Sequence, residues 1–550
     1  MKKIICVILS ILMVVSAAIP AVALPTPTQS SGSQVPVIAI FGDGEALRDT
    51  DDNIVFKFSE LLNIFNDSGE SGETEEESGV LDAVVNIMQP FLVEGILFNK
   101  WDNYYAALEK EIGELFTEVQ YDKNGESKND IDISKNLRDL MAYNMTVDKK
   151  QGKGSYYAYD YQFWYDWRQD PLKTADEFHA YIEGIKKATG CDKVSVLARC
   201  LGTTVVMAYI AKYGTDSLYG VAFDGSVVEG AELISETISG EFTVDAAGIN
   251  RFLLDMNATG SASIDNFIMK SIDLAEKSGA IDVLTGTVKY TVYNKIVKGV
   301  TSALSLGTFF TWPGYWACVS EEDYENALLY VFGEEGSAKR TEYAGLIEKI
   351  ENYQTLVRAE LDTLYDAMDE SGMRIGVIAK YGFQIAPVCK SSDQFADQYA
   401  TLNKASFGAS VADSIYDTFS DDYIAQREAE GKAKYISPDR QVDASTCRWP
   451  QYTWFTKNIS HSYWHDFETA LLYRVITSDV QYTVDDFDCT QFTVHDYETG
   501  LVSAMTEDNC HTEAWYEEVK DGEPNFLQRI MEFFKTLFEW IRLAFSKLTA

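Results

Sequence analysis

Residues 193–214 constrain the fold more than any other part of the 550-residue chain. They read KVSVLARCLGTTVVMAYIAKYG: an apolar run, a tight turn at RCLG, and a helical pattern that ends at Gly214. A second helical pattern, which ends at Gly190, comes directly before them. Helix, strand and helix in this close succession are typical of a parallel sheet covered by helices. The sequence therefore predicts an α/β fold.

The flanking segments extend the same pattern. The aromatic run at 156–171 predicts a strand that stops at Pro171, and Thr174 with Glu177 forms a capping-box pattern for the helix that follows. The apolar run VPVIAIF at 35–41 predicts an earlier buried strand, and MRIGVIAKYG at 373–382 a later one. These segments predict a core at 35–225 that resumes at 341–479.

Cys200 lies in the turn between the predicted strand and helix. Ala198 and Gly202 lie two residues before and after it, and small residues there permit the sharp turn that exposes a nucleophile. The backbone N–H of Leu201, at the helix N-terminus, is expected to stabilise an oxyanion and to lower the thiol pKa. Cys200 is therefore a candidate nucleophile, the alternative being an inert buried thiol. Ser305, in ALSLG, has no helix pattern after it and is the weaker candidate.

A nucleophilic cysteine needs a base and a group that orients the base. His461 is the candidate base because it lies at a loop–helix junction, whereas His179 is inside a helix on the wrong side of the strand. The acid candidates are Asp439 and Asp443. His461 and His465 have a spacing that could bind zinc, but no H-E-x-x-H glutamate lies between them, so no metal is expected.

The N-terminus predicts export. A basic MKK start, a short apolar run and an AVA pattern indicate a signal peptide at 1–23, followed by a flexible leader at 24–34. Seven cysteines follow the signal, and an odd number leaves one thiol without an intramolecular partner. A strand between Cys191 and Cys200 would hold them about 20 Å apart, too far for a disulfide. The formal net charge of −39, with scattered basic residues, excludes a nucleic-acid partner.

Four further regions are expected around the core. Residues 66–79 are an acidic loop, and residues 226–340 are a mostly helical lid inserted over the sheet. A small β region at 480–523 contains a predicted hairpin flanked by Cys489 and Cys510, which could form a bridge. Residues 524–550 have the pattern of an amphipathic helix that can contact a membrane surface, a partner or its own domain.

Several motifs together resemble the α/β-hydrolase superfamily, in particular its lecithin:cholesterol acyltransferase and lysosomal phospholipase branch. YDWRQDP resembles the YDWR signature of this branch, VIAIFGDGEAL its first strand and oxyanion loop, and TFFTWPGYWACVSEEDY its lid segment. PDRQVDAST is similar to its acid turn, and NISH to the segment that contains the histidine. The resemblance covers most of residues 35–479 in patches.

The resemblance implies an α/β-hydrolase fold with a Cys200–His461–Asp439 triad and a second oxyanion N–H from Asp43. Three positions depart from the family pattern: Cys200 replaces serine, Arg199 replaces a common histidine, and Ala198 replaces glycine. The implied activity is acyl hydrolysis or acyl transfer on small esters or lipids through an acyl-thioester, without a cofactor. The alternatives are a secreted binding protein that has lost turnover and, less favoured, a cysteine peptidase.

Overall fold

The computed structural model describes residues within 35–56, 86–136, 159–241, 295–299 and 308–510, with gaps inside these ranges. Several sequence-based predictions fall on residues outside the described part. These are the signal peptide 1–23, the leader 24–34, the acidic loop 66–79, the amphipathic helix 524–550, and the individual residues Ser305, His465 and Cys489.

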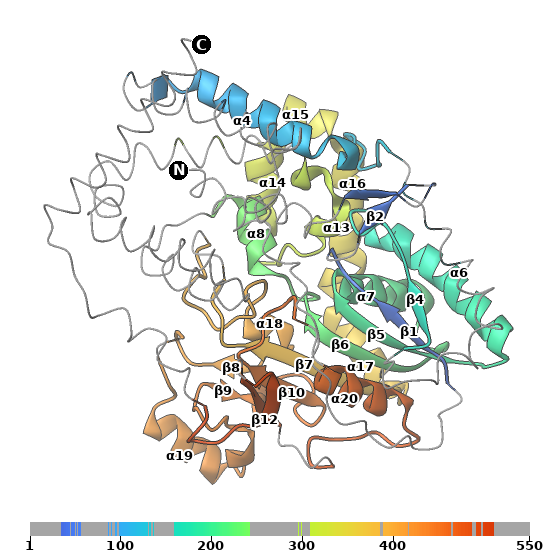
Figure 1. Ribbon diagram of the computed structural model, residues 1–550, viewed down its shortest axis with the longest axis vertical. Helices are drawn as coiled ribbons and strands as arrows, with labels where there is room; N and C mark the ends of the chain where they lie inside the picture. The colour runs from blue at the N-terminus through green and yellow to red at the C-terminus, as the bar shows by residue number, and fades with distance from the viewer. Residues whose placement is uncertain are drawn as a thin grey trace, which may run out of the picture.

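An eight-stranded sheet organises the molecule (Figure 1). Its strand order is β12-β11-β10-β7-β6-β5-β1-β4, and every neighbouring pair is parallel except β11 and β12. The predicted mostly parallel α/β architecture is confirmed. The strands are β1 (Val37–Ile40), β4 (Tyr161–Phe163), β5 (Val194–Cys200), β6 (Leu218–Ser226), β7 (Arg374–Tyr381), β10 (Thr453–Lys457), β11 (Phe492–Asp496) and β12 (Leu501–Ala504).

Helices cover both faces of this sheet. Because side chains alternate along a strand, Ile38 and Ile40 of β1 belong to one hydrophobic cluster while Val37 belongs to another. The first cluster contains residues of α6 (Pro171–Thr189), α7 (Leu201–Tyr213) and α17 (Leu361–Glu370), and the second contains residues of α20 (Asp466–Thr477). The inner strands β1, β5, β6, β7 and β10 are buried on both faces, which explains their nearly continuous apolar sequences.

Helix α6 begins one turn earlier than the capping-box pattern predicts. Its N-cap is Asp170, whose side chain accepts a hydrogen bond from the Leu172 backbone N–H at 2.9 Å. Pro171 occupies the first helical position, where its missing N–H costs nothing. Thr174 therefore lies inside the first turn, and the predicted cap is wrong. Gly190 ends the helix in the left-handed conformation, as expected.

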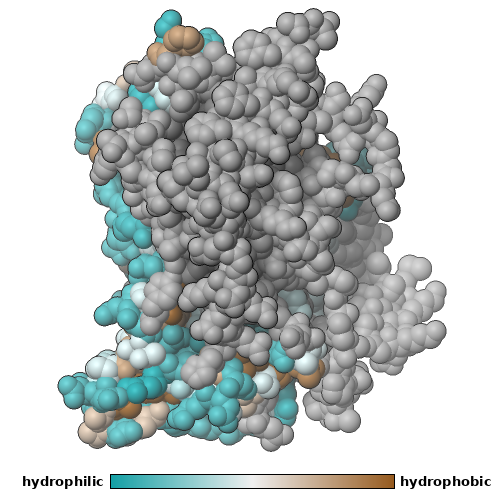
Figure 2. All heavy atoms as spheres, turned by 60° about the vertical axis from the view of Figure 1, so that its left-hand side comes forward, coloured by the Kyte–Doolittle hydropathy of each residue, from teal (hydrophilic) through white to brown (hydrophobic). Residues whose placement is uncertain are grey.

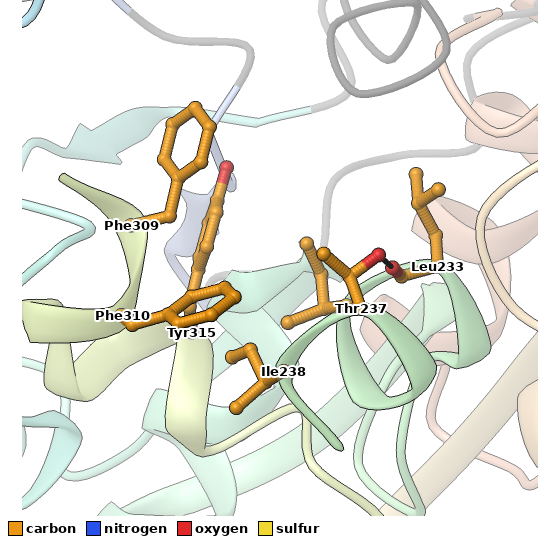
Figure 3. Close-up of a pocket in the computed structure, with 7 residues that line it drawn as sticks. Leu233, Thr237, Ile238, Phe309, Phe310 and Tyr315 are labelled. Carbon is orange, nitrogen blue, oxygen red and sulfur yellow. Dashed lines mark hydrogen bonds between the residues drawn. The ribbon is translucent and has the colours of Figure 1, made fainter. Parts of the chain in front are cut away.

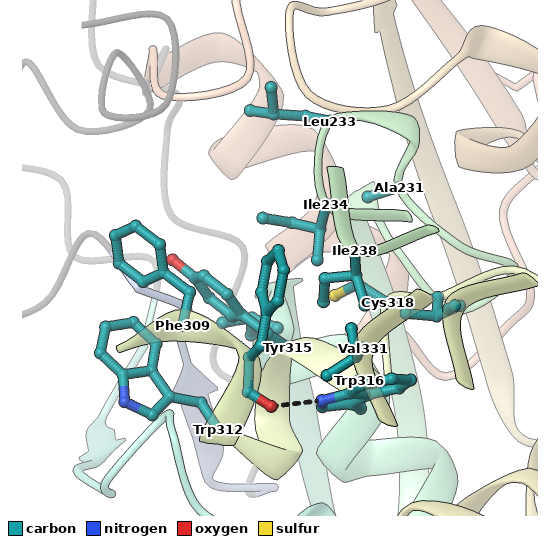
Figure 4. Packing of buried hydrophobic residues seen from close by; sticks show 14 of the residues in the cluster. Ala231, Leu233, Ile234, Ile238, Phe309, Trp312, Tyr315, Trp316, Cys318 and Val331 are labelled. Atoms are coloured by element: carbon teal, nitrogen blue, oxygen red, sulfur yellow. Dashed lines mark hydrogen bonds between the residues drawn. The ribbon is translucent and has the colours of Figure 1, made fainter. Parts of the chain in front are cut away.

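A second group of helices lies between β6 and β7 in the sequence and above the sheet in Figure 1. One buried cluster joins α8 with the segment around α13, and in Figure 4 the aromatic rings of Phe309, Trp312 and Tyr315 lie opposite aliphatic side chains of α8. The elements are α8 (Glu232–Ser239), η4 (Phe309–Thr311), α13 (Pro313–Trp316), α14 (Tyr324–Phe332), α15 (Ala338–Glu342), α16 (Ala344–Leu356) and η5 (Arg358–Glu360). Helix α4 (Asp102–Leu115) and η3 (Thr117–Val119) lie between β1 and β4 in the sequence.

The C-terminal half differs from the sequence prediction in the make-up of its sheets. The segment 438–447 contributes β9 (Val442–Asp443) to a separate two-stranded sheet with β8 (Ser410–Val411). The main sheet continues instead through β10, which was not predicted. The hairpin β11–β12 has the predicted strands but extends the main sheet. The remaining elements are β2 (Leu47–Arg48), β3 (Ile54–Phe56), α18 (Leu402–Ala405), α19 (Asp421–Ala429), η6 (Ala433–Tyr435) and η7 (Ala444–Thr446).

On the face in Figure 2, the described residues at the left edge are mostly hydrophilic. Within the described ranges, no helix has the length and apolar composition needed to cross a bilayer. Cys510 is present as a free thiol, and its proposed partner Cys489 lies outside the described residues, so the bridge stays a prediction. Strand β5 separates Cys191 from Cys200, as the argument against that disulfide requires.

Candidate active site

The carboxyl ends of four parallel strands bring polar side chains together at one edge of the sheet. Asp43 follows β1, Cys200 is the last residue of β5, Asp397 lies in the long connection after β7, and His461 follows β10. Ligands bind at this edge in open α/β sheets, because the loops there converge on a crevice. The four residues are far apart in sequence and lie together only because of the strand order.

The backbone at Cys200 is strained. Its φ of 53° and ψ of −132° lie in a region that residues with a side chain rarely adopt, and the residue links β5 directly to α7. Gly202 makes the turn possible, because a Cβ there would be 2.3 Å from the Ile40 carbonyl oxygen. Gly42 is equally constrained, because its Cβ would be 2.8 Å from the Cys200 Sγ. The local geometry is that of a nucleophile elbow.

The thiol of Cys200 is buried and donates a hydrogen bond to Oδ1 of Asp43, 3.8 Å away. Burial and the Asp43 carboxyl raise the pKa of Cys200 well above its usual value, and the Leu201 N–H and Arg199 oppose this only in part. The expected lowering of the thiol pKa by the Leu201 N–H is present. Burial and the neighbouring acid outweigh it, so the pKa is raised overall.

His461 pairs with Asp397. Its Nδ1 lies 2.7 Å from Oδ2 of Asp397, and its backbone N–H donates to the Asp397 carbonyl oxygen at 2.7 Å. Oδ1 of Asp397 accepts the backbone N–H groups of Tyr399 and Ala400, each at 3.0 Å. Burial favours the neutral acid, but the attraction of His461 and these hydrogen bonds hold the pKa of Asp397 below its ordinary value. The other ring nitrogen, Nε2, is buried and makes no hydrogen bond to any described residue.

Asp439 does not lie at His461, so its predicted role as the orienting acid is wrong. Its Oδ2 accepts from Nζ of Lys457 at 2.9 Å and from the hydroxyl of Tyr381 at 3.0 Å. It neutralises a lysine that β10 places in the interior. Asp443, the other acid weighed, pairs with Arg427, whose Nε lies 2.8 Å from Oδ2.

Buried charges fix the loop that contains His461. Arg199 donates from its guanidinium to the carbonyl oxygens of His461 and Tyr463. Lys380 also donates to the Tyr463 carbonyl, at 3.1 Å. Asp224 balances both cations: its carboxylate lies 3.6 Å from Nε of Arg199 and 2.7 Å from Nζ of Lys380. Arg199 thus links the elbow to the histidine loop, which gives a structural reason for this residue before the nucleophile.

The YDWR segment fixes the loop after β1. The Tyr165 hydroxyl donates to the carbonyl oxygen of Phe41 at 2.6 Å, two residues before Asp43. Arg168 is fully buried and forms an ion pair with Asp166, with 2.7 Å between Nη2 and Oδ2. The Arg168 carbonyl accepts the backbone N–H of Gly314 at 2.9 Å, so the segment also contacts α13.

The two residues predicted to supply oxyanion N–H groups lie beside the thiol. Leu201 is the first residue of α7, and its backbone nitrogen would be 2.9 Å from a Cβ placed on Gly42, the neighbour of Asp43. The loop after β1 and the helix N-terminus therefore meet at Cys200. The Asp43 side chain, for which sequence analysis predicted no role, also lies next to the Cys200 thiol.

A small apolar pocket opens beside this group of residues. In Figure 3, Phe309, Phe310 and Tyr315 lie on one side, and Leu233, Thr237 and Ile238 of α8 on the other. Tyr315 connects the pocket to the thiol, because its hydroxyl donates to Oδ2 of Asp43 at 2.9 Å. The lining carries almost no polar groups, so it suits an apolar ligand.

Sequence reasoning missed Asp397 and the Asp43 carboxylate. Asp397 belongs to SSDQFADQYA, which has no motif and lies well past the end of β7. The available signal was positional: in the order nucleophile, acid, histidine an acid is expected between the elbow and His461, and Asp397 lies there, in the connection after β7. The resemblance of PDRQVDAST to an acid turn led instead to Asp439, which lies further along the chain.

Comparison with known proteins adds little to this geometry. No protein-family model matches the chain, and no curated protein matches it. Among solved structures, one match is the crystal structure of a Tle4–Tli4 complex, at 14% sequence identity, over 63% of this chain and 75% of that chain, with a TM-score of 0.23. A likeness at this level carries no argument, so the functional case rests on the residues themselves.

Proposed function

We propose that this chain is a secreted acyl hydrolase or acyltransferase of the α/β-hydrolase type, in which Cys200 is the nucleophile, His461 the base and Asp397 the orienting acid. The single observation that carries the proposal is the strained Cys200 at a strand–helix turn. Backbone strain of this kind lowers stability by roughly 1–3 kcal/mol and is concentrated at functional sites. An inert buried thiol needs no such geometry.

The proposed reaction proceeds in two stages. His461 Nε2 takes the proton from Sγ, the sulfur bonds to the ester carbonyl carbon, and the backbone N–H groups of Leu201 and Asp43 hold the oxyanion. The intermediate collapses, and the departing alcohol takes the proton from His461. Water or an acceptor alcohol then attacks the thioester with His461 again as base, which releases the acid or new ester and restores the thiol.

The pocket supports an apolar acyl group as the substrate. It is lined by aliphatic and aromatic side chains, and Tyr315 places it next to the thiol. In this proposal the segment 308–319 covers the acyl group, in the role of the lid. Contact of residues 524–550 with a membrane surface is a further part of the proposal.

Ester hydrolysis tests the function. The wild-type chain should hydrolyse p-nitrophenyl butyrate with a kcat/KM at least about tenfold above that for the acetate, because the pocket buries two extra methylenes. Ile234→Trp, which fills the pocket, should remove this preference, and Leu329→Trp on the exposed face of α14 is the matched control. Wild-type turnover no faster than that of Cys200→Ala would contradict the proposal.

One observation favours the alternative of a binding protein without turnover. The thiol is held protonated by burial and by Asp43, as expected for a cysteine that does not react. A folded wild-type protein that binds a fluorescent fatty-acid ester but releases no alcohol would support this second function.

A further inference from the structure

The Asp43 carboxyl group is a second acid at the site, in addition to Asp397. It is 2% exposed and follows β1 directly. Its two oxygens contact different groups: Oδ1 accepts from the Cys200 thiol, and Oδ2 accepts from the hydroxyls of Tyr315 at 2.9 Å and Tyr399 at 3.3 Å. Three donors from three different parts of the chain thus converge on one carboxyl group.

The thiol proton is directed to Asp43 rather than to the histidine. The only side-chain hydrogen bond that the structure gives to the Cys200 thiol is the one to Asp43, among the residues described. His461 lies close, because its ring stacks on Tyr399, which contacts Asp43, with 4.6 Å between the ring centres of His461 and Tyr399. Its Nε2 makes no hydrogen bond within the described part of the chain. The base and the nucleophile are therefore near each other but not engaged.

The charged groups around the pair favour a protonated sulfur. Asp43 faces Cys200, Tyr315, Tyr399 and His461; burial raises its pKa, and these four groups oppose the rise. Cys200 also faces Cys318, which is buried, and Arg199, a cation that opposes the rise in thiol pKa. A thiolate would therefore form next to an acid, in a buried site.

We propose that Asp43 is a positioning residue that keeps the Cys200 sulfur protonated and turned away from His461 until an acyl substrate displaces its carboxyl group. The carboxyl group lies next to Sγ through Oδ1, and the two tyrosine hydroxyls hold it there through Oδ2. In this proposal an entering ester displaces the carboxyl group, the thiol turns toward His461, and Nε2 accepts its proton. The nucleophile is thus protected from small electrophiles and oxidants. This consequence rests on the proposed function, whereas the effect of Asp43 on the thiol does not.

Alkylation of the full-length protein by iodoacetamide tests the effect on the thiol without any ester. The rate at Cys200 is followed by peptide mass spectrometry from pH 5 to 10, with Cys200→Ser as the blank for the other thiols. Asp43→Asn and Asp43→Ala should each lower the apparent thiol pKa and speed alkylation at pH 7 by about tenfold or more, one factor of ten per pH unit. Asp43→Glu, which keeps a carboxyl group, should remain slow.

Asp170→Asn is the matched control, because it makes the same change at a half-buried aspartate that caps α6 and accepts from the Leu172 N–H rather than from the thiol. An unchanged or raised thiol pKa in folded Asp43→Asn and Asp43→Ala would overturn the inference. The two proposals fail separately. Faster alkylation without ester turnover by any variant supports the role of Asp43 and contradicts the proposed function, and turnover with an unchanged thiol pKa does the reverse.

Discussion

At the scale of single residues, the hydrogen-bond partners of two buried carboxylates, Asp397 and Asp439, distinguish the orienting acid from a structural one. Asp397 gives one oxygen to His461 and the other to two backbone N–H groups, so it is held as an anion at the imidazole. One oxygen of Asp439, Oδ2, accepts hydrogen bonds from both Lys457 and Tyr381. Both side chains are buried aspartates, but only Asp397 orients a residue that can transfer a proton.

Exchange of each carboxylate for an amide separates these roles. Asp397→Asn should lower kcat/KM for p-nitrophenyl butyrate by roughly 10³–10⁴-fold, because the imidazole loses its orienting anion. Asp439→Asn should leave kcat/KM within about threefold and instead lower the free energy of unfolding by about 3 kcal/mol, because it leaves the Lys457 charge buried without its partner. Steady-state kinetics and urea unfolding measure the two effects. The reverse pattern would restore Asp439 as the acid.

At the scale of elements, each functional residue is positioned by a neighbouring segment that has no chemistry of its own. Tyr165 fixes the loop after β1 through the Phe41 carbonyl, and Arg199 fixes the histidine loop through two carbonyls. Helix α6 follows the Tyr165 segment directly and packs its apolar face on the sheet. The start of α6 therefore contributes to the stability of the fold and not to the chemistry of the site.

The N-cap of α6 provides a stability test at this scale. Asp170→Ala should lower the free energy of unfolding by about 1 kcal/mol, because the Leu172 N–H loses its acceptor. Thr174→Ala should cost less than Asp170→Ala, since Thr174 is inside the helix and is not its cap. Urea unfolding followed by circular dichroism measures both. A larger loss in Thr174→Ala would support the capping box that the sequence pattern indicates.

At the scale of the whole molecule, the sequence predicted what local patterns determine. The strand–turn–helix at Cys200, the hairpin β11–β12 and the mostly parallel sheet follow from apolar periodicity and turn residues. The pairing of Asp397 with His461 does not, because 64 positions separate them and no local pattern records which carboxylate faces the imidazole. The raised thiol pKa was missed for the same reason, since it depends on burial and on Asp43, 157 positions away.

The central claim is that Cys200 forms a covalent acyl intermediate with His461 as its base. Intact-mass analysis of the full chain incubated with p-nitrophenyl butyrate tests it most directly, beside Cys200→Ala and His461→Ala. We expect one butyryl group per chain, mapped to Cys200, absent in Cys200→Ala and formed far more slowly in His461→Ala. A folded wild-type protein with a free Cys200 thiol and no adduct, or an adduct that persists in Cys200→Ala, would contradict the claim.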